Sequence, residues 1–253
     1  MNNKNKISIY IINKNYAKFL NKALESVKIQ SYKNIEIIII DDHSSDKSTN
    51  VIKDFKKKNE NVTTIFNKKS IGLIKNINRA IKQCKGQYVL RLDADDYLHP
   101  KAIEALYNIA RSDKKIGLVF PNFYWIHQKS KIISRFNYKC KKICSSKNIP
   151  AHGACSLIKK EILKKIGMYS NKFDRQDGYY IWFKILANNY KIYHEKKHLF
   201  YYRKHTNNLS KNKKKIYRAR INIINYFLQK NTKLHADLIS HKRDTLKLLL
   251  QKN

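Results

Sequence analysis

The sequence predicts an α/β fold in which a mostly parallel sheet carries helices on both faces and C-terminal helices follow. Three observations support this prediction. Short runs rich in isoleucine, valine and aromatic residues alternate with longer stretches whose apolar residues recur at helical spacing. Two of the short runs end abruptly in carboxylates, at Asp41-Asp42 and at Asp93-Ala94-Asp95-Asp96. No glycine- or serine-rich linker divides the 253 residues, so one large domain with an appendage is expected.

The first half of the chain is the regular part. We expect buried strands at 7–12, 35–40, 62–66, 88–92 and 116–123, with amphipathic helices between them at 16–29, 48–58, 71–84 and 100–112. This order predicts a Rossmann-like sheet, so both acidic strand ends should lie along one edge, where such sheets bind ligands. The second half is less regular: strands are expected at 131–136, 153–158 and 192–202, a loop at 140–151, and helices at 159–166, 177–187, 211–228 and 233–250.

The acidic strand ends are candidates for metal chemistry. Asp93, Asp95 and Asp96 would repel one another unless a cation lies between them. Mg²⁺ and Mn²⁺ prefer oxygen ligands, and Mg²⁺ usually takes one or two carboxylates plus substrate phosphates. The alternative is an acidic turn that caps the helix after Pro100. Neither a dinucleotide-type glycine fingerprint nor a P-loop is present, so a bound diphosphate would need another source of positive charge.

Charge and cysteine content suggest further partners. The net charge is +36, from 54 Lys and Arg against 18 Asp and Glu. This charge favours polyanions such as nucleic acid, anionic membrane or phosphorylated substrates, although the lysines are spread as on solvated helix faces. The densest part, 203–253, has 14 basic and 2 acidic residues. Cys140 and Cys144, with His127 and His152 nearby, make a zinc site conceivable, but the spacing fits no standard ligand pair and reduced thiols are expected.

Seven motifs follow one another over about residues 7 to 210: Asn15 to Leu20, Ser26 with Gln30, Glu36 to Asp46, Gly72 through Asn78 to Gly86, Leu92 to Asp96 with Pro100 (an Asp-x-Asp motif), Gln176-Asp177, and Tyr202 to His205 with Asn208-Leu209-Ser210. In their order and spacing they resemble family 2 glycosyltransferases, which have the A-type glycosyltransferase fold. The chain departs from the family pattern at Ile12 and Lys14 (commonly Pro and Tyr), at His43 (usually Gly) and at Gln176 (usually Glu).

The resemblance implies roles for individual residues. Asn15, Asp42, Asp93 and Asp96 would bind the nucleotide-sugar donor, with Asp42 on the base. Asp93, Asp95 and His205 would hold Mn²⁺ or Mg²⁺, Asp95 foremost; His205 could equally be a surface histidine. These implied roles make the predicted ligand a metal-bound nucleoside diphosphate.

The resemblance also implies the reaction. Asp177 would be the general base that takes the proton of an acceptor hydroxyl, a role typically worth ~10²–10⁴-fold in rate. Its alternative is a helix cap. His152 and Gly153 lie where relatives form the acceptor pocket. The implied function is a metal-dependent inverting transfer of a sugar, from a donor predicted to be UDP-linked, to a glycan or glycolipid acceptor in surface polysaccharide synthesis.

Two alternative functions are nucleic-acid binding and nucleotidyl transfer. A basic nucleic-acid-binding protein would explain the charge, but no nucleic-acid motif appears, so nucleic acid is an unlikely partner. A nucleotidyltransferase would need a glycine-rich, arginine-containing loop after Ile12, which is missing.

The resemblance divides the chain into a catalytic domain at 1–210 and a basic helical extension at 211–253. The catalytic domain has a nucleotide-binding half (about 1–125) and an acceptor half (about 126–210). We expect a cytoplasmic protein, because no apolar stretch approaches a membrane span and no signal-peptide core follows the N-terminus. The extension would contact the anionic inner face of the plasma membrane, or else pack on the domain or on a second subunit.

Overall fold

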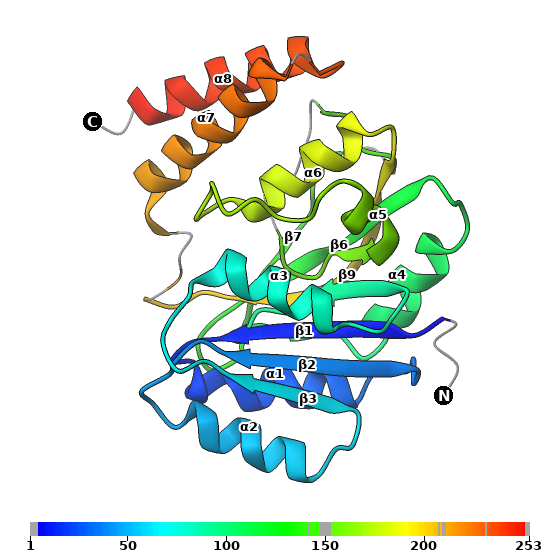
Figure 1. Ribbon diagram of the computed structural model, residues 1–253, viewed down its shortest axis with the longest axis vertical. Coiled ribbons are helices and arrows are strands. Elements are labelled where there is room, and N and C mark those ends of the chain that lie inside the picture. The colour runs from blue at the N-terminus through cyan, green and yellow to red at the C-terminus, as the bar shows by residue number, and fades with distance from the viewer. Residues whose placement is uncertain are drawn as a thin grey trace.

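The computed structural model describes residues 5–140, 142–146, 153–206, 208, 211–230 and 232–250. Within this part of the chain, nine strands form one sheet in the order β3-β2-β1-β4-β8-β6-β9-β5, and β7 pairs with β6. The predicted α/β class is confirmed, and the sheet is mixed only in its second half (Figure 1).

The first half forms the parallel part of the sheet. Its strands are β1 (Ile7–Asn13), β2 (Ile35–Asp41), β3 (Val62–Phe66) and β4 (Tyr88–Arg91), and its helices are α1 (Ala17–Lys28), α2 (Ser48–Lys57) and α3 (Leu73–Gln83). β1 lies between β2 and β4 and is parallel to both. The observed elements fall within about two residues of the predicted ones, because long periodic apolar patterns specify the type of element better than its ends.

The second half mixes strand directions. It contains β5 (Tyr97–Leu98), α4 (Ala102–Ala110), β6 (Ile116–Ile126), β7 (Ile132–Phe136), β8 (Leu157–Lys159), α5 (Lys160–Lys165), α6 (Asp177–Ala187) and β9 (Lys191–Arg203). β8 lies between β4 and β6 and is antiparallel to both, whereas β6 and β9 are parallel. The insertion of β8 places the 153–159 segment beside the acidic end of β4.

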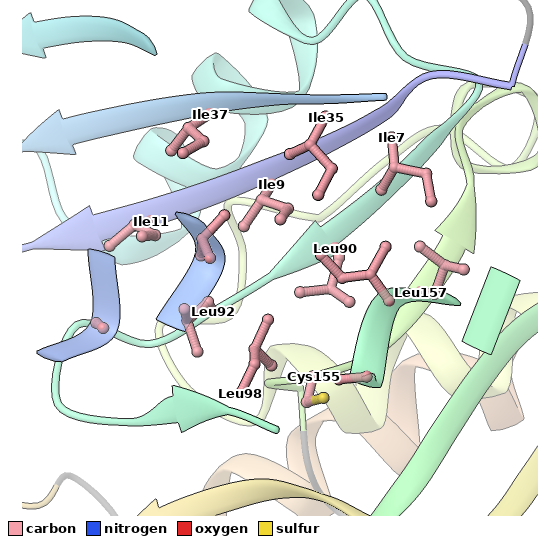
Figure 2. Packing of buried hydrophobic residues seen from close by; sticks show 14 of the residues in the cluster. Ile7, Ile9, Ile11, Ile35, Ile37, Leu90, Leu92, Leu98, Cys155 and Leu157 are labelled. Carbon is pink, nitrogen blue, oxygen red and sulfur yellow. The ribbon is translucent and has the colours of Figure 1, made fainter. Parts of the chain in front are cut away.

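Two apolar cores cover the two faces of the sheet. Alternation along β1 sends Ile7, Ile9 and Ile11 to one face, where they pack with Leu90 and Leu157 (Figure 2). The other face carries Tyr10 and packs against α3, α5 and α6. β1 and β2 are therefore buried on both sides, which explains their high isoleucine content, whereas β3 at the edge of the sheet is partly exposed.

The C-terminal helices α7 (Lys213–Gln229) and α8 (His235–Leu250) pack beside α6 (Figure 1). Asn212 caps α7 by accepting a hydrogen bond from the Lys215 amide at 3.0 Å. Phe227 of α7 lies 5.7 Å from the ring of Tyr180 and 5.7 Å from that of Phe183. Packing on the domain is therefore observed for α7. No helix of the described chain combines the length and the apolarity that crossing a bilayer requires.

Candidate functional site

The acidic strand ends meet at one edge of the sheet, as expected. In the parallel register Asn13 of β1 lies opposite Asp41 of β2, and Tyr10 of β1 lies opposite Arg91 of β4. The residues that follow β2 and β4 therefore flank the end of β1. The two acidic segments come together because their strands are both parallel to β1, so direct contact between the acids is not required.

Asp42 anchors the turn that precedes α3. Its carboxylate accepts hydrogen bonds from the Asn67 side chain (2.8 Å), the Ser70 hydroxyl (2.7 Å) and the backbone amides of Ile71 (2.9 Å) and Gly72 (3.1 Å). Burial alone would raise the pKa of Asp42, but these donors outweigh it and hold the pKa below its ordinary value. Gly72 has φ +84°, which L-residues rarely adopt but achiral glycine adopts freely. A nucleotide base at Asp42 would have to replace or share one of these donors.

Asn15 fixes the loop after β2. Its side-chain oxygen accepts the Ser45 amide at 2.8 Å, and its own amide donates to the Ser44 hydroxyl at 2.9 Å. In the same loop His43 has φ +63°. Glycine adopts this left-handed backbone without strain, so the turn is compatible with the glycine of the family pattern, and His43 holds the same backbone at some cost in strain.

Arg91 joins two of the predicted carboxylates, and sequence reasoning did not single it out. Its Nε donates to Asp93 Oδ1 at 2.6 Å, and its Nη1 donates to Asp177 Oδ2. The side chains of Arg91 and Asp177 are about 10% exposed, so the pair is largely withdrawn from water. Burial opposes the charge, yet both carboxylates raise the pKa of Arg91 well above its ordinary value. The available signal was a cation inside an otherwise apolar strand.

Gly153 lies against this ion pair. A Cβ atom there would approach Asp177 Oδ2 to 3.0 Å and Arg91 Nη1 to 3.1 Å. A glycine therefore lets the 153–156 segment pass close to both charged groups. The companion prediction, His152, lies outside the described residues.

Asp95 and His205 form a second pair in the site. His205 Nε2 lies 2.8 Å from Asp95 Oδ2, although 110 residues separate them in the sequence. The histidine ring is buried against Tyr16 and Phe19. Arg203 at the end of β9 donates from Nε to the Asp95 carbonyl at 2.6 Å, which fixes the backbone of the acidic turn.

The Asp95–His205 pair fits a divalent cation in its chemistry. Carboxylate oxygen suits Mg²⁺ and Mn²⁺, and imidazole nitrogen shifts the preference toward transition metals such as Mn²⁺. Asp93 instead turns its Oδ1 toward Arg91. In the described chain no three His, Cys, Asp or Glu side chains are grouped as metal ligands, so a bound cation would take its remaining ligands from substrate phosphates and water.

Asp96 is the most buried acid of the motif. It is 2% exposed, and its Oδ1 accepts the Arg203 amide at 2.8 Å. Burial, followed by the nearby charges of Asp95 and Asp93, raises the pKa of Asp96 well above its ordinary value. Asp96 does not cap α4, which has no side-chain cap, so the alternative role of the acidic turn as a helix cap is not what the structure shows.

Several of these groups line one cleft, whereas Asn15, Asp42 and His205 are not among its lining residues. Its walls include the acidic turn, Arg91, Gly153, Gln176 and Asp177. Gln176 has φ +59° and accepts a hydrogen bond from Arg220 of α7 at 2.7 Å. A second, basic pocket adjoins the cleft and shares Tyr202 and Asn208 with it. This basic pocket is lined by Trp125, Gln128, Tyr202, Lys204, His205, Thr206, Asn208, Lys211 and Lys213.

Comparison with known proteins decides the family. The family model described as "Glycosyl transferase family 2" matches residues 8–167. The chain belongs to glycosyl transferase family 2. The predicted membership and the enzyme class of glycosyltransferase are thereby confirmed at the level of family.

Related sequences agree with this membership. An uncharacterized glycosyltransferase of Methanocaldococcus jannaschii is 30% identical over 182 residues, which cover 69% of this chain and 62% of that protein. An uncharacterized glycosyltransferase of Rickettsia typhi is 31% identical over 191 residues, covering 71% and 58% respectively. The chain thus spans about three fifths of the length of these relatives.

Solved structures share the fold. TarS 1–349 of S. aureus in complex with UDP-GlcNAc superposes with a TM-score of 0.76 at 18% identity, over 97% of this chain and 71% of that one. The mannosyltransferase PcManGT of Pyrobaculum calidifontis, in complex with GDP-Man and Mn²⁺, gives 0.75 at 13% identity, over 94% and 69%. At such identities the likeness confirms the A-type glycosyltransferase fold of this family 2 chain.

Proposed function

We propose that this family 2 member is a metal-dependent inverting glycosyltransferase. It moves a sugar from a nucleotide-sugar donor to a hydroxyl group of a glycan or glycolipid acceptor in surface polysaccharide synthesis. The observation that carries the proposal is the cleft in which Asp95, backed by its partner His205, and the Arg91–Asp177 pair face the same space. One pair suits a metal-bound diphosphate, and the other suits proton transfer.

The donor side rests on Asp95 and His205. A cation held there would offset the negative charge that develops on the departing diphosphate. The pair is at hydrogen-bond distance, so it requires little rearrangement to share a cation. Arg203, which is 1% exposed, keeps the turn in place. The complex of PcManGT with GDP-Man and Mn²⁺ supports the same cofactor for this chain.

The acceptor side rests on Asp177. A hydroxyl is a weak nucleophile, so a carboxylate that accepts its proton lowers the barrier to attack on the anomeric carbon. Arg91 orients this carboxylate from one side, and Gly153 leaves space for it on another. A buried arginine that bonds Asp177 through Nη1 and Asp93 through Nε limits the Asp177 carboxylate to a few orientations. His152, which lies outside the described residues, is proposed as a further acceptor-binding residue on the family resemblance alone.

Base recognition rests on the loops after β1 and β2. Asn15 holds the 43–45 turn, and Asp42 presents a carboxylate at the end of β2. If an N–H group of a bound base replaced one of the turn amides as a hydrogen-bond donor, Asp42 would stay fully hydrogen-bonded. Uracil carries such an N–H group, so the arrangement favours a uracil base. The UDP and UDP-GlcNAc complexes of TarS support a UDP-linked donor. Asp96 is assigned to the donor through its position beside Asp95.

The basic pocket is the proposed acceptor entrance. Lys204 Nζ lies 4.2 Å from the centroid of the half-buried Trp125 ring, which shows that a cationic or apolar group can stack there. Lys204, Lys211 and Lys213 form no ion pair within the described chain. An aromatic platform ringed by unpaired lysines suits a sugar that carries a phosphate or carboxylate, so we assign the pocket to an anionic acceptor.

Membrane contact is proposed for the outer side of α8. Ile239, Leu246, Leu248 and Leu250 are exposed among basic residues, and basic residues near an anionic surface contribute ~1 kcal/mol each. Removal of residues after 210 should then abolish binding to anionic liposomes. Undiminished binding of the truncated, folded protein would exclude α8 as the contact. A nucleic-acid-binding function receives no support, because the cleft is lined by carboxylates.

Calorimetry tests the proposed function directly. UDP, GDP, TDP and CDP are titrated with and without Mn²⁺ into the wild type and into Asp95→Ala. We expect one diphosphate to bind only with Mn²⁺ and the variant to lose this binding. Asp54→Ala, a substitution on the exposed face of α2, is the control. If folded protein binds none of the four with Mn²⁺, the proposed function is wrong.

A further inference from the structure

Outside the cleft, a cysteine, a histidine and an asparagine form a hydrogen-bonded chain. Cys140 lies in the segment after β7, and its Sγ is 3.4 Å from His194 Nδ1. His194 is on β9, and its Nε2 is 2.7 Å from Asn122 Oδ1 on the paired strand β6. This is the order of groups that activates cysteine nucleophiles: thiol, imidazole and an orienting amide.

The hydrogen bonds around Asn122 determine the imidazole tautomer. The Asn122 Nδ2 donates to the Lys196 carbonyl at 2.7 Å and to Asn137 Oδ1 at 3.1 Å. Its Oδ1 accepts the Tyr138 amide at 3.0 Å, so the amide orientation is fixed. Since this oxygen can only accept, His194 Nε2 must carry a proton. The other nitrogen, Nδ1, is then free to take the proton of the thiol.

The imidazole is held rigidly in this orientation. His194 is 2% exposed and stacks on Phe120, with ring centroids 4.9 Å apart and 11° between planes. The backbone amide of His194 donates to the Lys142 carbonyl at 2.8 Å. The backbone amide of Cys144 donates to the Ile192 carbonyl at 2.9 Å. The segment that carries both cysteines is therefore tied to β9.

The two cysteines differ in protonation. A hydrogen bond from Cys144 is the main cause that lowers the pKa of Cys140, to about 5. Burial opposes this shift, and His194 adds to it. The same hydrogen bond, together with burial, raises the pKa of Cys144. Tyr138 is a further titratable group that interacts with Cys140, and burial foremost raises the pKa of Tyr138, so it stays neutral. Cys140 is half-buried rather than enclosed, which leaves its sulfur open to small reagents.

We propose that Cys140 is a reactive thiolate, a modification site for hydroperoxides and soft electrophiles, and that Cys144 is its resolving thiol. The Cys140 thiolate attacks a peroxide oxygen, the O–O bond breaks, and the leaving hydroxide takes a proton to form water. Cys144 then attacks the resulting sulfenic sulfur, an S–S bond forms, and a second water leaves. In sum, two thiols and one hydrogen peroxide give one disulfide and two waters. The proposal is independent of the glycosyltransferase reaction.

Alkylation as a function of pH tests the thiolate. The folded protein is labelled with iodoacetamide between pH 6 and 8.5, and each cysteine is followed by peptide mass spectrometry. An ordinary thiol of pKa about 8.5 should change its rate roughly 150-fold over this range. The alkylation rate of Cys140 should change less than about threefold over the same range. Cys84 and Cys155 are buried and serve as internal controls that stay unlabelled. An ordinary, steep profile at Cys140 would overturn the proposal.

Two variants and hydrogen peroxide test the mechanism. His194→Phe keeps a ring on Phe120 but removes the proton acceptor, so the pH profile of Cys140 should become steeper than in the wild type, while the hydrogen bond from Cys144 remains. Treatment of the wild type with hydrogen peroxide should join the Cys140 and Cys144 peptides. In Cys144→Ser the reaction should stop at a sulfenic acid that dimedone traps. Absence of the joined peptides in peroxide-treated wild type would also overturn the proposal, even if His194→Phe failed to fold.

Discussion

Replacement of Arg91 by leucine should cost a large part of the stability of the protein. Arg91 lies between Asp93 and Asp177, and its removal leaves the carboxylate of Asp177, which is 11% exposed, without its cation. Loss of one partner of a buried ion pair typically costs about 3–5 kcal/mol. For a chain of this size that corresponds to a fall in Tm of roughly 2–4 °C per kcal/mol.

A double-mutant cycle isolates the ion pair from the loss of arginine packing. In Asp177→Asn, Arg91 keeps its ion pair with Asp93, so we expect the free energy of unfolding to fall by only about 1–2 kcal/mol. In the Arg91→Leu/Asp177→Asn double variant no carboxylate is stranded at position 177. Its destabilisation should therefore be less than the sum of the singles by about 1–3 kcal/mol.

Urea unfolding followed by circular dichroism measures all four proteins, in low and high salt. The matched control is the Lys57–Asp54 pair on α2, whose side chains are 77% and 67% exposed. Lys57→Leu should cost under about 1 kcal/mol and should lose its effect in salt. An Arg91→Leu cost below about 1 kcal/mol, or strict additivity in the cycle, would refute the assignment of a buried, energetically coupled pair.

Three further predictions concern the site. Asp177→Asn should retain diphosphate affinity in calorimetry and lose turnover by about 10²–10⁴-fold; near-normal turnover would remove Asp177 from the mechanism. Lys211→Ala/Lys213→Ala should raise the KM for an anionic acceptor several-fold without changing that for the donor, whereas the equally spaced surface pair Lys56→Ala/Lys58→Ala should not; equal effects would show that only net charge matters. Asp42 has a lowered pKa in the folded state, so its contribution is present above the unfolded pKa of about 3.9 and is lost as pH falls. The stability gap between wild type and Asp42→Asn should therefore narrow in acid, and a gap that widens toward low pH would contradict this.

Periodicity and motif spacing together predicted most of the fold. The alternation of apolar runs and amphipathic stretches predicted the parallel strands β1 to β4 and their helices. Strands in the middle of a covered parallel sheet need apolar side chains on both faces, and this requirement leaves a recognisable apolar run in the sequence. The abrupt change from Leu92 to Asp93 predicted the sheet edge that lines the cleft. The ordered motifs, rather than any one residue, predicted the family.

Contacts between distant residues could not be predicted in this way. The bond from Arg91 to Asp177 spans 86 positions and that from Cys140 to His194 spans 54. The number of residues between the partners gives no sign that they meet. Whether they meet depends on the order of strands in the sheet, in which β8 lies between β4 and β6. The packing of α7 on α6 likewise depends on which apolar faces remain uncovered once the sheet has formed.

The sequence by itself determined the types of element, the edge at which the acids gather and the family to which the chain belongs. These properties depend on short-range patterns, which are local in the chain. Only the tertiary structure decided that Asp95 pairs with His205, that Arg91 holds Asp93 and Asp177 together, and that a buried imidazole faces Cys140. Those arrangements depend on the register and order of strands far apart in sequence, which the folded packing alone specifies.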